Sequence, residues 1–257
     1  MTTESMSMSS VARCYALEAG YQLLSLARMP AFALPTILFP AMFYVFFGLM
    51  FGGGSSRVNV PTYMMVTFST FGVIAPALFG FGVSVAGERG LGWLRLKRAS
   101  PMPPGAYLAA KTVTAMASAL AVVLILFTLG AYFGNVTMPA GSWLLLAVTL
   151  IAGSLPFCAL GLAIGLNIGT QAAPAVVNLI YMPLAFLSGL WVPLYLFPDW
   201  IQHLAPALPP YHLARLALHA AGQAPEVNWP VNLAALGGFT LLFALIARRG
   251  WRRMKEA

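Results

Sequence analysis

Long apolar runs alternate along this chain with short polar segments. A helix needs about 20 predominantly apolar residues to cross the hydrocarbon core of a bilayer, and most of the runs reach that length. They cover residues 31–51, 63–85, 112–133, 143–166, 175–197 and 231–247. The pattern predicts an all-α integral membrane protein with about six transmembrane helices, built as a single transmembrane domain over residues 1–257.

Residues 11–29 precede the first run and have a one-sided helical pattern. At about 100° per residue, small and apolar side chains gather on one face. That face carries Ala12, Tyr15, Ala16, Ala19, Leu23, Leu26 and Ala27, and the opposite face carries Cys14, Glu18, Gln22, Ser25 and Arg28. We expect an amphipathic helix lying in the membrane interface, with Glu18 and Arg28 on its polar side.

The segment 87–110, between the second and third runs, is too charged for the hydrocarbon core. Each Arg or Lys there would cost roughly 2.5–3.5 kcal/mol. Its charged residues are Glu88, Arg89, Arg95, Lys97 and Arg98. Gly90 and Gly92 end the incoming span, and apolar residues alternate with the later cations. The segment is either a plain cytoplasmic loop or a helix on which a soluble partner docks.

Composition and charge support a membrane protein and indicate its orientation. The 257 residues are 60% hydrophobic and 8% charged, against roughly 25% charged in soluble domains. The net charge of +8 lies in short loops and at the ends of apolar runs, which favours orientation in a membrane over binding of nucleic acid. Nearly all Lys and Arg lie in the N-terminal segment, in the segment between the second and third runs and at the C-terminus. These three regions lie on the same side of the membrane only if the number of spans is even. Because positive charge marks the cytoplasmic side, both termini are expected in the cytoplasm. The two cysteines, Cys14 and Cys158, imply no structural disulfide.

Two stretches carry a resemblance to a known family. The first is Glu88-Arg89-Gly90-Leu91-Gly92-Trp93-Leu94, followed by Ser100-Pro101 and Lys111. The second is Phe186-Leu187-Ser188-Gly189, followed by Pro193, Phe197-Pro198 and Leu208-Pro209-Pro210-Tyr211-His212. Together they resemble type-2 ABC exporter permeases, although the second acidic residue and the Thr usual in the first motif are absent.

This resemblance implies the membrane-spanning subunit of an ATP-driven exporter in a bacterial inner membrane. Two permeases, as a homodimer or heterodimer, would assemble with separate ATP-binding subunits that bind ATP and Mg, so no cofactor is expected in this chain. The N-terminal helix would also touch the ATPase. Glu88, Arg89 and Gly90 would mark the coupling helix and gate, and Arg95, Lys97 and Arg98 would steer it toward an acidic partner surface or anionic lipid headgroups.

In the same family, the second and fifth spans line the substrate route. The corresponding side chains here are Met65, Phe68, Phe71, Phe79, Tyr181, Met182 and Phe186. If they point inward the route is apolar, which favours a hydrophobic or amphipathic substrate such as a drug, a natural product or a lipid-linked molecule. The alternative is that these side chains face lipid or neighbouring helices.

The segment 199–228 follows the fifth run and is expected outside the cell. Its short amphipathic pieces predict a re-entrant or interfacial helical pair. His203, His212 and His219 all lie in it, and His212, Arg215 and His219 share one helix face. Metal binding is conceivable, but the cation within that face favours a water-exposed helix surface.

The fourth run contains Gly161, Gly165 and Gly169 at four-residue spacing. Such a ridge permits close approach of a second helix. Glycine is also simply common in membrane helices, so the spacing alone leaves both interpretations open.

Catalytic chemistry is not evident. Apart from end residues, the six runs contain no Asp, Glu, Lys, Arg or His, so they offer no ion-coupling site and no catalytic or metal-binding set. The stretch 105–112 only approximates a phosphate-binding loop, because Ala110 stands where glycine is required. An external energy source is therefore expected. The alternatives are a membrane-embedded lipid-modifying enzyme or assembly factor, and a passive channel.

Overall fold

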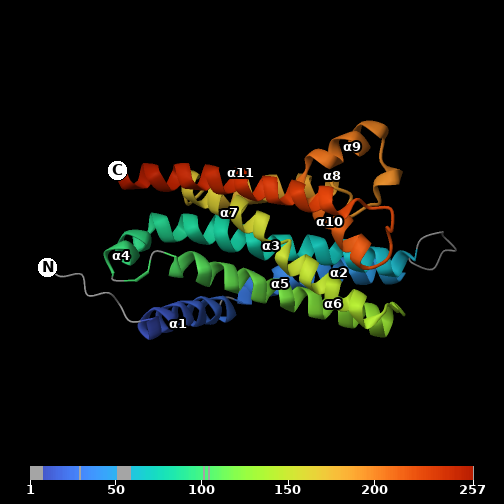
Figure 1. The fold of residues 1–257 in the computed structure, drawn as a ribbon, viewed down its shortest axis with the longest axis horizontal. Coiled ribbons are helices and arrows are strands. Elements are labelled where there is room, and N and C mark those ends of the chain that lie inside the picture. The colour runs from blue at the N-terminus through green and yellow to red at the C-terminus, as the bar shows by residue number, and fades with distance from the viewer. Residues whose placement is uncertain (1–7, 29, 51–58, 101, 104, 257) are drawn as a thin grey trace.

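The computed structural model describes residues 8–28, 30–50, 59–100, 102, 103 and 105–256, and every regular element in that part is a helix (Figure 1). The first half contains α1 (Met8–Ala27), α2 (Pro30–Phe43), the π-helix η1 (Tyr44–Met50), α3 (Val60–Gly90), α4 (Trp93–Ala99) and α5 (Ala106–Phe133). The second half contains α6 (Ala140–Ala152), α7 (Leu155–Asn167), α8 (Ala173–Leu187), η2 (Leu194–Leu196), α9 (Asp199–Leu204), η3 (Ala205–Ala207), α10 (Pro209–Ala220) and α11 (Trp229–Glu256). The all-α fold class is confirmed.

The helices form an elongated bundle with two distinct ends. Four segments are long and apolar enough to cross a membrane, namely Val60–Gly90, Ala106–Phe133, Ala140–Asn167 and Trp229–Arg252. Two shorter apolar helices, Thr36–Met50 and Ala173–Leu187, correspond to the first and fifth predicted runs. The helix α4, the helix α1 and the C-terminal end of α11 lie at one end, and α9 and α10 lie at the other (Figure 1). With α1 and the end of α11 at the same end of the bundle, the described part of the chain fits an even number of membrane crossings.

Several predicted boundaries need correction. The helix α3 continues to Gly90 and α5 begins at Ala106, so the segment between the second and third spans is shorter than 87–110. The fourth span is two helices, α6 and α7, separated at Gly153 and Ser154. The fifth run ends as a helix at Leu187 rather than 197, because Gly189 turns the chain with a positive φ of 78°.

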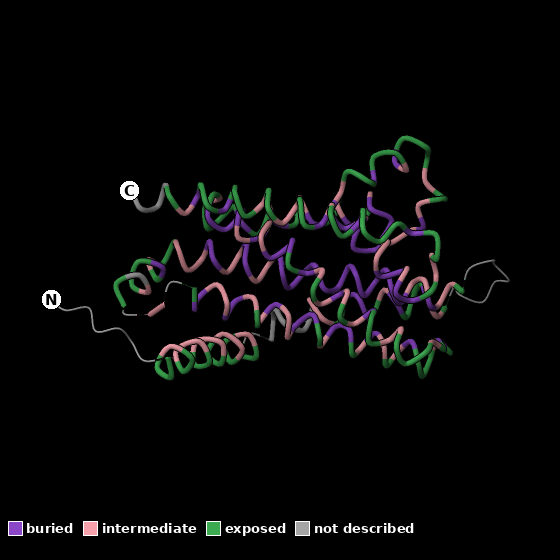
Figure 2. The backbone as a smooth tube through the Cα atoms, viewed as in Figure 1, coloured by how far each residue is buried: buried purple, intermediate pink, exposed green. Residues whose placement is uncertain are grey.

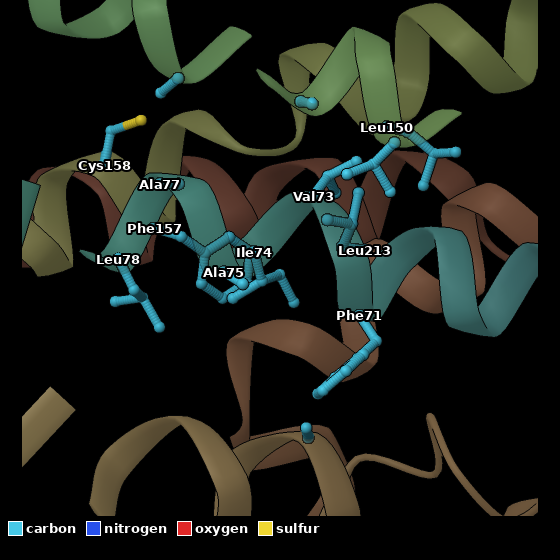
Figure 3. Close-up of a cluster of buried hydrophobic side chains, with 14 of the residues drawn as sticks. Phe71, Val73, Ile74, Ala75, Ala77, Leu78, Leu150, Phe157, Cys158 and Leu213 are labelled. Carbon is cyan, nitrogen blue, oxygen red and sulfur yellow. The ribbon is translucent and has the colours of Figure 1, made fainter. Parts of the chain in front are cut away.

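The helix α3 forms the centre of the bundle. Its first turn is fixed by Asn59, whose side chain accepts a hydrogen bond from the Thr62 N–H at 3.2 Å. Figure 2 shows buried residues concentrated along α3, whereas α1 has none and α11 is largely exposed. In Figure 3, Val73 and Ile74 of α3 lie in one apolar cluster with Leu150 of α6, Phe157 of α7 and Leu213 of α10. The helices α6, α7 and α10 therefore share one apolar core with α3.

Small residues bring α3 and α7 into backbone contact. A Cβ on Gly161 would lie 2.9 Å from the Leu78 carbonyl oxygen and the Phe81 Cβ. A Cβ on Gly165 would lie 2.8 Å from the Phe81 oxygen. Nothing lies within 4 Å of the corresponding position at Gly169. The close-approach interpretation of the glycine ridge is confirmed for its first two members only.

The helix α1 packs beside α5, and its partly covered side combines residues of both predicted faces, namely Tyr15, Ala19, Leu23 and Leu26 of the apolar face and Cys14, Glu18 and Gln22 of the polar face. Glu18 and Gln22 are partly covered because they make polar contacts with each other and with α4. Large apolar side chains point outward instead, at Leu17, Tyr21 and Leu24, and Arg28 is exposed. The predicted placement of α1 in the membrane interface stays a prediction.

The predicted external pair divides into two unlike helices. The helix α9 is mostly exposed, with Ile201 as its buried residue. The helix α10 is inserted among α3, α6 and α11 and buries Leu213, Ala217 and Leu218. The apolar face of α10 therefore meets protein, and its re-entrant placement in the membrane stays a prediction.

We expect Gly165→Ala to destabilise the protein by about 1–3 kcal/mol, because its Cβ would press against backbone atoms of α3 that cannot move aside cheaply. Thermal unfolding of the detergent-purified protein measures this. Gly169→Ala is the matched control, since its Cβ meets open space. Equal unfolding temperatures for the two variants would show that the α3–α7 contact tolerates extra volume.

Candidate functional site

The charged segment after α3 forms a tight turn and a short helix. The Leu91 N–H donates to the Gly87 carbonyl and the Gly92 N–H to the Arg89 carbonyl, both at 3.0 Å, which closes α3. Gly92 has a φ of 77°, a conformation that favours glycine, and α4 starts directly after it. The turn therefore sets the direction of α4 from the end of α3.

Glu88 forms a buried ion pair with Lys111 at the end of α3. The Lys111 Nζ donates to Glu88 Oε1 at 2.6 Å and also to the Ser84 hydroxyl, which itself donates to Glu88 at 3.1 Å. The Lys111 side chain is 5% exposed and that of Glu88 is 14% exposed. Charges this deeply buried are stable only when paired. The pair therefore joins α3 to α5.

Arg89 joins the end of α3 to the end of α7. Its guanidinium donates to the carbonyl oxygens of Leu166 and Ile168, which the α7 C-terminus leaves without helical partners. A cation at this position also complements the negative end of the helix dipole. The Thr170 hydroxyl adds a hydrogen bond to the Ala86 carbonyl at 2.9 Å, and Gly90 leaves room for that side chain.

Lys97 joins α4 to α1. Its Nζ forms an ion pair with Glu18 and lies 4.6 Å from the centre of the Tyr107 ring. The same ring lies 5.6 Å from the Lys111 Nζ. Tyr107 therefore lies between the two ion pairs, and these contacts connect α4 to α1, α3 and α5.

The outer face of α4 carries exposed apolar and cationic side chains. Leu91, Trp93 and Leu96 are largely exposed, and Arg95 is exposed beside them. Leu94 is buried against the bundle and anchors the helix. The side chain of Arg98 lies outside the described part of the chain. In the protein as described, α4 presents an unpartnered, mixed apolar and basic surface at the end of the bundle.

The charged residues singled out in the sequence therefore divide into two groups. Glu88, Arg89, Lys97 and Glu18 make contacts within this chain, whereas Arg95 faces outward. Contact of any of them with an ATPase stays a prediction. Sequence reasoning missed that Lys111 is the partner of Glu88. A cation at the start of an apolar run, with a carboxylate at the end of the preceding run, is the signal that could have found it.

Two cavities lie along one side of α3, with Phe79 in the lining of both. The first, the Lys111 cavity, has a volume of about 300 Å³. Its walls are Gln22, Ser25 and Leu26 of α1, Pro76, Phe79, Gly80, Val83 and Ser84 of α3, and Lys111, Thr114, Ala115 and Ser118 of α5. The second, the Tyr181 cavity, has a volume of about 220 Å³ and lies between α2, α3 and α8.

The Tyr181 cavity contains part of the predicted substrate route. Phe71, Phe79, Tyr181 and Met182 all line it, and the Tyr181 hydroxyl donates to the Phe71 carbonyl at 2.9 Å. Phe186 is partly exposed beside Trp191 and Phe197 instead.

The prediction needs correction for Met65 and Phe68, which are 0% exposed and lie inside the core. Phe68 stacks on Phe43 and Phe47, and Met65 packs against Gly130. They face neighbouring helices of the same chain because their side of α3 meets η1 and α5.

The histidines form no metal site among the described residues, where no group of three or more His, Cys, Asp or Glu side chains could hold an ion. The expected water-exposed face is wrong for His212. It is buried, and its ring nitrogens each lie 2.9 Å from an oxygen, one of Asn232 and one of Pro206. His203 and His219 lie against the carbonyls of Asp199 and Ala224.

We expect Glu88→Ala to lower the free energy of unfolding by about 3 kcal/mol, because it leaves the buried Lys111 ammonium without its counter-charge. The double variant Glu88→Ala with Lys111→Met should recover most of this loss, since no charge remains buried. Denaturation of the purified protein measures both. Equal losses in the single and double variants would show that the pair is not the source of the effect.

Comparison with known proteins agrees with this geometry. Residues 19–220 match a family model described as ABC-2 type transporter. The chain is also 28% identical over 237 residues to "Putative transport permease YvfS" of Bacillus subtilis (strain 168), an alignment that covers 90% of this chain and 93% of that protein. The family match spans the end of α3, the helix α4 and both cavities. The protein therefore belongs to the ABC-2 type transporter family, as a membrane-spanning permease subunit rather than an enzyme.

Proposed function

We propose that this chain is the permease of an ATP-driven exporter and that α4 is the helix on which a separate ATP-binding subunit docks. The observation that carries the proposal is the exposed surface of α4 and of the turn before it, which carries Leu91, Trp93, Arg95 and Leu96. Exposed aromatic and apolar side chains beside an arginine are typical of protein interfaces. ATP and Mg would be bound by the docked subunit.

The proposed energy source follows from where the charges lie. The described ion pairs, Glu18–Lys97 and Glu88–Lys111, both sit at the α4 end of the bundle. Transporters that couple to protons or sodium usually place such groups near the bilayer midplane. The pairs are instead placed to receive motion from α4, so the driving force would come from the docked ATPase.

The proposed orientation places the α4 end in the cytoplasm of a bacterial cell, with the protein in its inner membrane. Basic residues concentrate at that end, in α4 and in Arg248, Arg249 and Arg252 of α11. Cytoplasmic segments next to spans carry an excess of Lys and Arg. Both termini would then be cytoplasmic, and α9 and α10 would face outward.

The proposed substrate is a hydrophobic or amphipathic molecule, such as a drug, a natural product or a lipid-linked molecule. The Lys111 cavity offers polar groups at the cytoplasmic end, and the Tyr181 cavity beyond Phe79 is walled mainly by aromatic and aliphatic side chains. A molecule with one polar end and an apolar body would fit a polar cavity followed by an apolar one. A second permease copy, identical or related, would complete the route on the open side of the Tyr181 cavity.

The decisive experiment is purification of the tagged chain from membranes of its source organism. We expect an ATP-binding subunit to co-purify with the wild type and to be lost with Leu96→Glu, because a carboxylate on this 70% exposed side chain opposes docking of the apolar surface. Tyr195→Glu is the matched control, since Tyr195 is 66% exposed in η2 near the opposite end.

The control variant should retain the ATPase, and both variants should unfold at the wild-type temperature. Retention of the ATPase by Leu96→Glu would remove α4 as the docking helix. A folded wild-type chain that brings down no ATPase would overturn the exporter proposal as a whole.

A further inference from the structure

A third cavity lies away from α4 and away from the predicted substrate route. It has a volume of about 710 Å³ and lies between α6, α7, α10 and α11, open on one side, and we call it the α10–α11 cavity. Its lining residues on α11 are Trp229, Leu233, Leu236, Gly237 and Thr240. Ligand pockets in proteins have volumes of roughly 300–1,000 Å³, so this cavity is large enough for a bound molecule.

The cavity has the depth of one membrane leaflet. Two of its walls, α6 with α7 and α11, are segments long enough to cross a membrane. Its lining on α11 extends from Trp229 to Thr240, which is about 16 Å of helix. Half of a hydrocarbon core about 30 Å thick is about 15 Å. The cavity therefore begins at the α10 end and reaches about the bilayer midplane.

The break between α6 and α7 forms the inner wall of this cavity. Gly153 closes α6 and lies directly against the Leu213 side chain of α10, and Leu155 and Pro156 start α7 on the cavity wall. On α11, a Cβ placed on Gly237 would have nothing within 4 Å. Gly237 therefore leaves its part of the cavity wall open.

The walls favour hydrocarbon over a polar ligand. The Thr240 hydroxyl donates to the Leu236 carbonyl at 2.7 Å, and His219 Nδ1 lies 3.2 Å from the Ala224 carbonyl oxygen. The lining includes no acidic side chain and no Lys or Arg. Apolar cavities do not hold ordered water, and contacts with the walls are lost if the space stays empty. A flexible apolar chain is the occupant that this chemistry fits.

The polar end of the occupant is indicated by the rim. Trp229 begins α11, and His219 lies near the end of α10, so both are at the end of the cavity that faces α9 and α10. Tryptophan is enriched at the level of lipid headgroups. A lipid with its headgroup beside these two side chains would extend its acyl chain toward Thr240.

We propose that the α10–α11 cavity holds an acyl chain of a membrane phospholipid from the leaflet on the α10 side, which is the outer leaflet in the proposed orientation. The bound chain fills the space left by the α6–α7 break and holds α10 against α11. This binding does not depend on ATP or on a docked ATPase.

The test uses the full chain in lipid nanodiscs that contain phosphatidylglycerol with a diazirine on one acyl chain. After illumination, labelled residues are mapped by mass spectrometry. We expect the cavity-lining residues Leu145, Val148 and Leu233 to be labelled several-fold more than Leu124, an equally exposed residue of α5 that lines none of the three cavities described. Equal labelling at all four positions would overturn the proposal.

Gly237→Trp should fill the cavity and remove the excess label, whereas Gly238→Trp should leave it. Both glycines are exposed with open space at Cβ, but only Gly237 lines the cavity. Gly237→Leu is a milder second variant that should reduce the label in part even if the tryptophan variant folds poorly.

Three outcomes would contradict the proposal. Undiminished label in both Gly237 variants would show that lipid does not enter the cavity. Label that appears only during ATP turnover with a bound ATPase would indicate a transported molecule. Cross-links to a second copy in place of lipid would indicate a protein interface. The first and third outcomes can be observed whether or not an ATPase co-purifies, so failure here is distinguishable from failure of the exporter proposal.

Discussion

The close contact between α3 and α7 is the constraint on which the rest of the structure depends. Gly161 and Gly165 leave no side chain between the helices, so the backbone of α7 meets carbonyl oxygens of α3 directly. In a membrane, helices gain little from burying apolar surface against each other, because lipid tails are equally apolar. Close packing and polar contacts must hold them instead. Arg89 and Thr170 supply such contacts at the end of the same interface.

The charged side chains at the α4 end connect the α3–α7 pair to the neighbouring helices. Arg89 holds the end of α7, Glu88 holds α5 through Lys111, and Lys97 of α4 holds α1 through Glu18. Each contact is charge-assisted and partly or wholly removed from water, where such bonds are stronger and more directional. These contacts therefore link α4 and the end of α3 to α1, α5 and α7. The Lys111 cavity borders three of these helices, α1, α3 and α5, whereas the Tyr181 cavity shares only α3 with them.

At the opposite end of the bundle, a short helix is packed inside the protein. The helix α10 is only 12 residues long, yet it is buried among α3, α6 and α11. Its buried side chain His212 is not isolated there, since its ring nitrogens each lie 2.9 Å from an oxygen, one of Asn232 and one of Pro206. The break between α6 and α7 makes room for α10 and leaves the α10–α11 cavity beside it. A bound acyl chain would complete the packing that the protein alone does not supply.

The sequence by itself determined the class of the protein, the number and order of its apolar runs, and the location of its charged segment. These features depend on short stretches of sequence. The length of an apolar run, the charge density of a loop and a turn residue such as Gly92 each determine the structure of their own segment. The family motifs around Glu88 and Phe186 pointed to the same class.

Only the tertiary structure decided which side chains meet. Periodicity assigns residues to faces but does not say which face meets which neighbour, so it did not show that Glu18 meets Lys97 or that Met65 and Phe68 lie inside the core. For the same reason, periodicity could not predict the Glu88–Lys111 pair, whose members are 23 residues apart in the sequence. It also could not predict the contact of Arg89 with the Leu166 carbonyl of α7, 77 residues away. Such contacts depend on how helices dock, and docking is set by the shape and polarity of the whole bundle rather than by any one segment.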